Sequence, residues 1–274
     1  MRVSDLMTRS PVVAAPEWPL DKAIGLMAEL RLRHLPVVER GTLVGVVSER
    51  DLLEATGWKP DRYIEPDGAP KVVRDSMTLP VETVAADDEV GTAVGLLLDR
   101  RLGCLPVVGP AGRLVGILTV ADLLAALVRA CACAQGIGEL DAVVASCMSE
   151  APITVDARMT VADALEACSA QDIRHLPVQS DGWFVGIVSD RDLRLRVGRG
   201  EKERRLQETM STGLVTVGPE SLLSDAAELM HGRRVDSVPV TRDGRLVGML
   251  TTTDVLGVLR ERLAPAPGGP APEA

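Results

Sequence analysis

The sequence repeats itself four times, and this feature constrains the fold more than any other. Each copy begins at a methionine, ends at an aspartate and keeps the same spacing to within one residue; the copies run over 7–51, 77–122, 148–192 and 210–254. The one extra residue, in the second copy, lies in the Gly-Pro-Ala-Gly turn at 109–112, where an insertion is tolerated. A register held this closely indicates four units of the same fold, which we call repeats 1 to 4.

Within each repeat, the apolar residues follow one pattern. After a short strand they recur at i, i+3, i+4 and i+7, which predicts an amphipathic helix with one face in the core. Two strands joined by a hairpin turn follow, and then a second helix. Each repeat is therefore predicted to be an α+β unit in the order strand-helix-strand-strand-helix. The predicted inward faces of the first helices are Leu20, Ala23, Ile24 and Met27; Val90, Ala93, Val94 and Leu97; Val161, Ala164, Leu165 and Cys168; and Leu223, Ala226, Ala227 and Met230.

A single unit of this size buries too little apolar surface to be stable alone, so we expect the repeats to pair. Repeats 1 and 3 share Arg-His-Leu-Pro-Val and Ser-x-Arg-Asp, which repeats 2 and 4 lack, and this alternation indicates a duplicated two-repeat module. The Pro/Gly/Ala-rich C-terminal segment is expected to be disordered. The predicted boundaries are 1–128 for the first module (repeats 3–55 and 73–128), 129–143 for the linker, 144–262 for the second module (repeats 144–198 and 206–262) and 263–274 for the tail.

Composition excludes several classes of protein. The net charge of −9 argues against a nucleic-acid binder, which needs a basic face. No apolar stretch approaches the roughly 20 residues of a membrane helix, and Arg2, Asp5 and Arg9 interrupt any signal peptide. The five cysteines show no Cys-x-x-Cys spacing and are expected to be free thiols. These features predict a cytoplasmic protein whose partners include neither nucleic acid nor membrane.

The second helix of each repeat is preceded by Gly-apolar-apolar-Ser/Thr-x-x-Asp. One interpretation is structural: the hydroxyl caps the helix, and the carboxylate lies in its first turn. The other is functional: the helix N-terminus and the hydroxyl bind a phosphate, while the carboxylate accepts hydrogen bonds from a ribose. Both interpretations can hold together. The residues are Ser48 and Asp51, Thr119 and Asp122, Ser189 and Asp192, and Thr251 and Asp254.

Repeats 1 and 3 carry additional cationic and imidazole groups. Arg50 and Arg191 precede their aspartates, and an arginine fork suits phosphate, although an exposed first-turn arginine is an equal alternative. His34 and His175 precede the first hairpin strand, where no recurring partner supports a catalytic or metal role, so a packed histidine is favoured. Charge alone therefore makes repeats 2 and 4 poorer candidates for a phosphate.

Taken together, the Met-Thr/Ser start, the helix, the [His/Cys/Ser]-[Leu/Val]-Pro-Val strand and the Gly-to-Asp motif resemble the CBS (cystathionine-beta-synthase) domain over nearly all of residues 3–259. The resemblance implies two tandem pairs, called Bateman modules, that pack as a flat disc. It also implies clefts for AMP, ADP, ATP or S-adenosylmethionine, and four-repeat chains resemble the gamma subunit of AMP-activated kinase. The residues that it implies as nucleotide-binding are Ser48, Arg50, Asp51, Thr83, Thr119, Asp122, Thr154, Arg174, His175, Ser189, Arg191, Asp192, Thr216, Thr251 and Asp254.

Three threonines in this set, Thr83, Thr154 and Thr216, lie in the first strand, and Val13 replaces the threonine in repeat 1. A threonine there also suits a strand for structural reasons alone. Grouped by repeat, the fullest set belongs to repeat 3, which is expected to bind most tightly.

No phosphate loop or catalytic constellation recurs, and the repeats leave no room for a catalytic domain. The sequence therefore predicts a non-enzymatic ligand sensor that requires no cofactor and signals to a protein partner, as a monomeric disc or a homodimer. One alternative is an interaction scaffold with degenerate sites. A less favoured one is a thiol or metal sensor that uses Cys131 and Cys133 of the linker.

Overall fold

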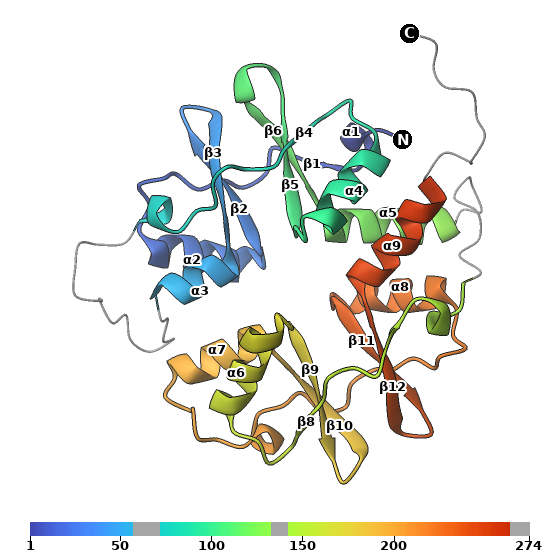
Figure 1. The fold of residues 1–274 in the computed structure, drawn as a ribbon. Helices are drawn as coiled ribbons and strands as arrows, with labels where there is room; N and C mark the ends of the chain where they lie inside the picture. The colour runs from blue at the N-terminus through green and yellow to red at the C-terminus, as the bar shows by residue number, and fades with distance from the viewer. Residues whose placement is uncertain (57–71, 133–141, 264–274) are drawn as a thin grey trace.

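The computed structural model describes residues 1–56, 72–132 and 142–263 (Figure 1). The predicted α+β fold of four repeats is confirmed, and the repeats surround a common centre with one module in each half. In the first module, repeat 1 contains α1 (Val3–Leu6), β1 (Thr8–Arg9), α2 (Leu20–Leu30), β2 (His34–Glu39), β3 (Thr42–Ser48) and α3 (Glu49–Thr56). Repeat 2 contains η1 (Val73–Asp75), β4 (Val84–Ala85), α4 (Val90–Asp99), β5 (Cys104–Val108), η2 (Pro110–Gly112), β6 (Leu114–Thr119) and α5 (Val120–Ala132).

The second module has the same order of elements. Repeat 3 contains η3 (Val144–Ser146), β7 (Ser149–Glu150), β8 (Val155–Asp156), α6 (Val161–Gln171), β9 (His175–Ser180), β10 (Trp183–Ser189) and α7 (Asp190–Gly198). Repeat 4 contains η4 (Leu206–Glu208), α8 (Leu223–Arg233), β11 (Ser237–Arg242), β12 (Arg245–Thr251) and α9 (Thr252–Leu263). Helix α5 continues to Ala132, into the stretch predicted as linker; residues 133–141 and 264–274 of the predicted linker and tail lie outside the described residues.

Local sequence explains these elements. The predicted inward residues of the first helices are all buried except Leu165, which is half-buried. The hairpins of repeats 3 and 4 turn at Asp181-Gly182 and Asp243-Gly244, as predicted, and both residues of each turn have positive φ. Such turns match the twist of the flanking strands. No helix among the described residues is long and apolar enough to cross a membrane.

The two repeats of a module exchange their leading segments. Strand β1 of repeat 1 pairs with β6 of repeat 2, and β7 of repeat 3 pairs with β12 of repeat 4. In the opposite direction, Thr78 bridges to Val46 and Ser211 bridges to Ile187. The exchanged segments also bury apolar side chains in the partner repeat. Val73, which precedes repeat 2, belongs to the core of repeat 1. A repeat therefore completes its core only with its partner.

This exchange explains two residues of the repeated motif. The opening methionine of each repeat lies over the motif glycine of its partner: Met7 over Gly116, Met77 over Gly45, Met148 over Gly248 and Met210 over Gly186. A Cβ atom at Gly116 would lie 2.6 Å from Sδ of Met7, closer than real Cβ contacts come. The glycine thus makes room for the methionine of the other repeat.

The modules meet through two unlike joints. Helices α4 and α5 of repeat 2 pack on α8 and α9 of repeat 4 (Figure 1), and one continuous hydrophobic core, which includes Leu97, Leu124, Met230 and Leu256, spans both repeats. The buried cores of repeats 1 and 3 form two separate clusters among the described residues. Because each buried leucine or methionine contributes about 1.5–3 kcal/mol, the joint of repeats 2 and 4 dominates the attraction between modules.

The sequence at equivalent positions accounts for this asymmetry. The first residue of the second helix is Val120 or Thr252 at the apolar joint, but Glu49 or Asp190 in repeats 1 and 3. Carboxylates at this position need cationic partners when they leave water, and repeats 1 and 3 supply arginines for them.

Candidate functional site

All four Ser/Thr-x-x-Asp motifs form reciprocal caps at the start of the second helix. The hydroxyl donates to Oδ2 of the aspartate at 2.6–2.7 Å, and the aspartate N–H donates to the hydroxyl oxygen at 3.1–3.4 Å. The structural interpretation is therefore present in every repeat. The cap leaves acceptor positions on both oxygens of each aspartate, so the same carboxylate can still accept hydrogen bonds from a ligand.

In the first module, candidate site residues of one repeat lie beside residues of the other. Oγ1 of Thr8, in repeat 1, donates to Oδ1 of Asp122, in repeat 2, at 3.4 Å. In the other direction, Thr83 of repeat 2 lines a pocket of about 240 Å³ with Leu43 and Val44 of repeat 1. The sequence grouped the site residues repeat by repeat, whereas in the structure residues of repeats 1 and 2 lie together.

The first-strand threonines lie away from the helix start of their own repeat. Oγ1 of Thr154 donates to Oε1 of Gln179 on β9 at 3.4 Å, whereas Ser189 pairs with His175 at the opposite end of that strand. Four residues of strand separate the two places by about 13 Å. Thr216 similarly accepts a hydrogen bond from Thr241 at 3.0 Å, far along β11.

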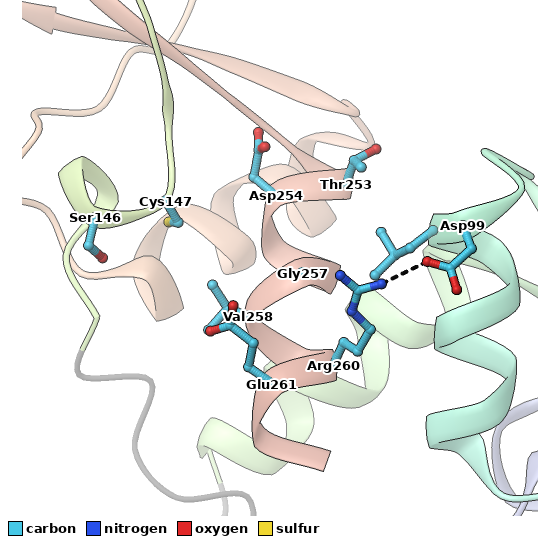
Figure 2. A pocket seen from close by; sticks show the side chains of 10 residues that line it. Asp99, Ser146, Cys147, Thr253, Asp254, Gly257, Val258, Arg260 and Glu261 are labelled. Atoms are coloured by element: carbon cyan, nitrogen blue, oxygen red, sulfur yellow. Dashed lines mark hydrogen bonds and ion pairs between the residues drawn. The ribbon is translucent and has the colours of Figure 1, made fainter. Parts of the chain in front are cut away.

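A pocket of about 450 Å³ lies beside Asp254 (Figure 2). It contains three carboxylates and one arginine, and Nη1 of Arg260 donates to Oδ1 of Asp99 at 2.9 Å. Burial raises the pKa of the Asp254 carboxyl, and burial followed by the charge of Asp254 raises the pKa of the Cys147 thiol. The walls are Thr253, Asp254, Gly257, Val258, Arg260 and Glu261 of α9, Ser146 and Cys147 before β7, and Leu98 and Asp99 of α4.

The pocket therefore joins the motif aspartate of repeat 4, the leading segment of repeat 3 and a helix of the other module. Of these residues, only Asp254 belongs to a repeated motif; Asp99, Cys147 and Glu261 occupy positions without one and were not predicted. Only the packing of α4 against α9 brings Asp99 to this pocket.

A second concentration of site residues lies at the centre of the molecule. The residue before the first hairpin strand is Arg33, Gly103, Arg174 or Asp236 in the four repeats, and contacts at or next to Arg33 involve the other three. Arg33 forms an ion pair with Asp236 of the other module, and the imidazole of His34 lies against Gly103. Desolvation, and then the nearby charge of Arg191, lowers the pKa of Arg33.

The two histidines of the centre are neutral near pH 7. Desolvation lowers the pKa of His34 and of His175 to about 4, and the positive charges of Arg33 and Arg174 add to this effect. Each neutral ring can donate one hydrogen bond and accept one. In the described part of the chain, no group of three or more His, Cys, Asp or Glu side chains could hold a metal ion.

The arginines predicted to bind phosphate form ion pairs between modules. Nη2 of Arg191 lies 2.9 Å from Oε1 of Glu49, while Nε of Arg50 lies 4.0 Å from Oδ2 of Asp190. Asp190 is buried and also accepts from Nε of Arg194 at 3.0 Å. A phosphate at either arginine must compete with these carboxylates. Glu49 and Asp190 were not among the predicted site residues, although repeats 1 and 3 alone carry an acid directly before the arginine, and this difference could have indicated a partner for it.

Two cysteines have a simple structural role. Cys104 and Cys168 are buried, and burial raises the pKa of each thiol to about 12. Such thiols pack as small apolar groups and are poor nucleophiles. Cys133 and the side chain of Cys131, on which the thiol or metal hypothesis depends, lie outside the described residues.

Comparison with known families gives the same fourfold division. The family model for the CBS domain matches residues 3–57, 73–129, 144–199 and 206–261. The chain belongs to the CBS domain family. Its four CBS domains are the four repeats described above.

Relatives that match nearly all of this chain include proteins of Methanocaldococcus jannaschii and Thermofilum pendens. An uncharacterized protein of Methanocaldococcus jannaschii, MJ1404, is 29% identical over 273 residues, which cover 93% of this chain but 61% of the relative. An uncharacterized 33.4 kDa protein encoded in a ribosomal RNA operon of Thermofilum pendens is 28% identical, covering 93% of this chain and 91% of the relative. The crystal structure of MJ1225 from M. jannaschii, described as a candidate archaeal homologue of γ-AMPK, superposes with a TM-score of 0.79 at 22% identity, over 94% of this chain and 100% of that one. This last similarity shows the shared four-repeat fold.

Proposed function

We propose that this CBS-domain protein is a regulatory sensor that binds an adenine-containing ligand in the pocket beside Asp254. The observation that carries the proposal is the composition of that pocket, which joins a motif aspartate to walls from both modules. Its volume of about 450 Å³ lies in the range of small-molecule sites. Resemblance to the CBS family supplies the expectation of an adenine nucleoside.

The charges of the pocket rank the possible ligands. Asp254 can accept hydrogen bonds from ribose hydroxyls, but Asp99, Asp254 and Glu261 together repel a polyphosphate. Arg260 is paired with Asp99 and offsets little of this charge. We therefore expect a neutral or cationic nucleoside, such as S-adenosylmethionine, to bind here more tightly than ATP. The arginines of the centre suit AMP, ADP or ATP better.

The position of the pocket also suggests how binding is transmitted. A ligand that touches α4 of one module and α9 of the other favours the packing in which both walls are in reach. Its differential affinity for that packing, typically about 1–3 kcal/mol, is the free energy available for signalling. A protein partner that contacts both modules would respond to it, and no chemical step is required.

Isothermal titration calorimetry with S-adenosylmethionine, AMP and ATP tests this proposal. Asp254→Asn should weaken the tightest ligand by roughly tenfold to a hundredfold, because a hydrogen bond to a charged group contributes about 1.5–3 kcal/mol. Asp163→Asn is the matched control, since Asp163 forms the same reciprocal cap with Thr160 on α6, outside the pocket. Equal losses in both variants, or no binding of any ligand, would contradict the proposal and favour the scaffold.

A further inference from the structure

We propose that the two modules form a one-sided hinge. The apolar joint of repeats 2 and 4 is its pivot, and repeats 1 and 3 are the side that opens and closes. The ion pairs between repeats 1 and 3 act as the latch. This inference concerns the packing of the modules and does not depend on the proposed ligand.

The pivot follows from the continuous core. Helices α4 and α5 pack on α8 and α9, and the core that they share includes Leu124 and Leu256 at equivalent positions of repeats 2 and 4. Opening this joint would expose apolar surface to water over both repeats. Close packing also makes such an interface stay shut or rearrange as a unit rather than stretch.

The latch consists of three ion pairs, of which two are reciprocal; in the third, Nη1 of Arg50 lies 3.7 Å from Oδ1 of Asp172. The two reciprocal pairs arise from equivalent tripeptides, Glu49-Arg50-Asp51 in repeat 1 and Asp190-Arg191-Asp192 in repeat 3. The first acid of each tripeptide pairs with the arginine of the other, at 2.9 Å for Glu49 with Arg191 and 4.0 Å for Asp190 with Arg50. The pseudo-twofold axis between the modules thus passes through a pair of matching contacts, as in an isologous interface.

Two features make the latch easy to open. The arginines are exposed, with 54% of the Arg191 side chain and 41% of the Arg50 side chain accessible, while Glu49 and Asp190 are 18% and 11% accessible, so salt acts on these pairs from the arginine side. Across the same side, Arg33 lies close enough to Arg174 and Arg191 for their positive charges to lower its pKa, after the larger effect of desolvation. The closed side therefore holds like charges together, and the acids of the latch offset their repulsion.

Distance measurements between labels on the full chain test the hinge. Spin labels attached through a ketone-bearing unnatural amino acid leave the native cysteines in place. One label pair, at the exposed positions Lys22 and Glu166, spans repeats 1 and 3; the other, at the exposed positions Thr92 and Glu228, spans repeats 2 and 4. Electron–electron resonance then reports the distance distribution across each side.

We expect a rise from about 0.05 M to about 1 M KCl to shift the Lys22–Glu166 distribution to longer distances. The Thr92–Glu228 distribution should stay in place. Glu49→Arg should produce the same one-sided shift at low salt, and the charge swap Glu49→Arg with Arg191→Glu should reverse it. Glu208→Arg is the control, because its ion pair with Arg204 lies within one module.

Equal lengthening of both distributions would overturn the hinge, since the modules would then separate as a whole. An unchanged Lys22–Glu166 distribution in salt, or a shift confined to Thr92–Glu228, would overturn it as well. The salt titration uses the native charges, so it decides the matter even where Glu49→Arg fails to fold.

Discussion

At the scale of single residues, one position takes on a different task in repeats 1 and 3 than in repeat 4. The arginines beside Asp51 and Asp192 hold the modules together in this structure, while the equivalent Thr253 lines a pocket. The motif histidines are equally specialised, because they lie among the arginines of the centre and stay neutral. Their neutrality links the stability of the fold to pH.

Because the folded pKa of each histidine, about 4, lies below its unfolded value of about 6.5, the unfolded chain binds protons first as the pH falls. Stability is therefore complete above pH 6.5 and lost progressively toward pH 4. Between pH 7 and pH 5 the loss should be about 1–2 kcal/mol for each histidine. Denaturant unfolding of the His34→Gln, His175→Gln double variant should show a shallower pH dependence than the wild type.

His231→Gln changes an exposed histidine on α8 and serves as the control. A double variant that loses as much stability on acidification as the wild type would show that these two rings do not set the pH dependence.

At the scale of elements, the exchange of leading segments is the main device that joins two repeats. Each exchange places a methionine over a glycine of the partner hairpin, but the neighbours of the four glycines differ in rigidity. A Cβ at Gly186 would meet the carbonyl oxygen of Ser211 at 2.7 Å, whereas the three atoms nearest to a Cβ at Gly45 all belong to the side chain of Met77. Backbone cannot move aside as a flexible thioether can.

We therefore predict that Gly186→Ala destabilises the fold by about 1–3 kcal/mol, as overpacking does, and that Gly45→Ala costs clearly less. Thermal unfolding of the two variants measures the difference. Gly25→Ala, on the exposed face of α2 with no atom near the new Cβ, should instead stabilise by up to about 1 kcal/mol. The interpretation fails if Gly45→Ala proves as costly as Gly186→Ala.

At the scale of the whole molecule, the two modules communicate through unlike joints. The joint of repeats 2 and 4 is a shared core, whereas ion pairs join repeats 1 and 3. The pocket beside Asp254 lies at the first joint, and the arginine-rich centre borders the second. A ligand at either place therefore acts on the relation between the modules.

This asymmetry predicts how the chain unfolds. Leu124→Ala and Leu53→Ala remove the same side chain from equivalent buried positions of repeats 2 and 1. Each should cost about 2–5 kcal/mol, but only Leu124 belongs to the core that spans both modules. In calorimetry we expect Leu124→Ala to separate the unfolding of the modules into two transitions, and Leu53→Ala to leave their coupling as in the wild type. Identical profiles of the two variants would argue against a single dominant joint.

The sequence by itself determined the units of this protein. Apolar periodicity located the first helices, glycine-containing turns located the hairpins of repeats 3 and 4, and the spacing from Met to Asp located the caps and Asp254. These features depend on interactions within a few residues, so local sequence is enough to specify them. Periodicity shows which face of a helix is buried, but it does not show what covers that face.

Only the tertiary structure decided which residues of different repeats contact one another. In the structure, Met7 lies over Gly116, Asp99 lines the pocket beside Asp254, and Arg191 forms an ion pair with Glu49. Each of these contacts joins residues far apart in the chain, and each repeat offers similar surfaces to several neighbours. The choice among them depends on whether apolar or charged side chains occupy equivalent positions of two facing repeats, because apolar faces gain free energy by losing water while carboxylates resist that loss.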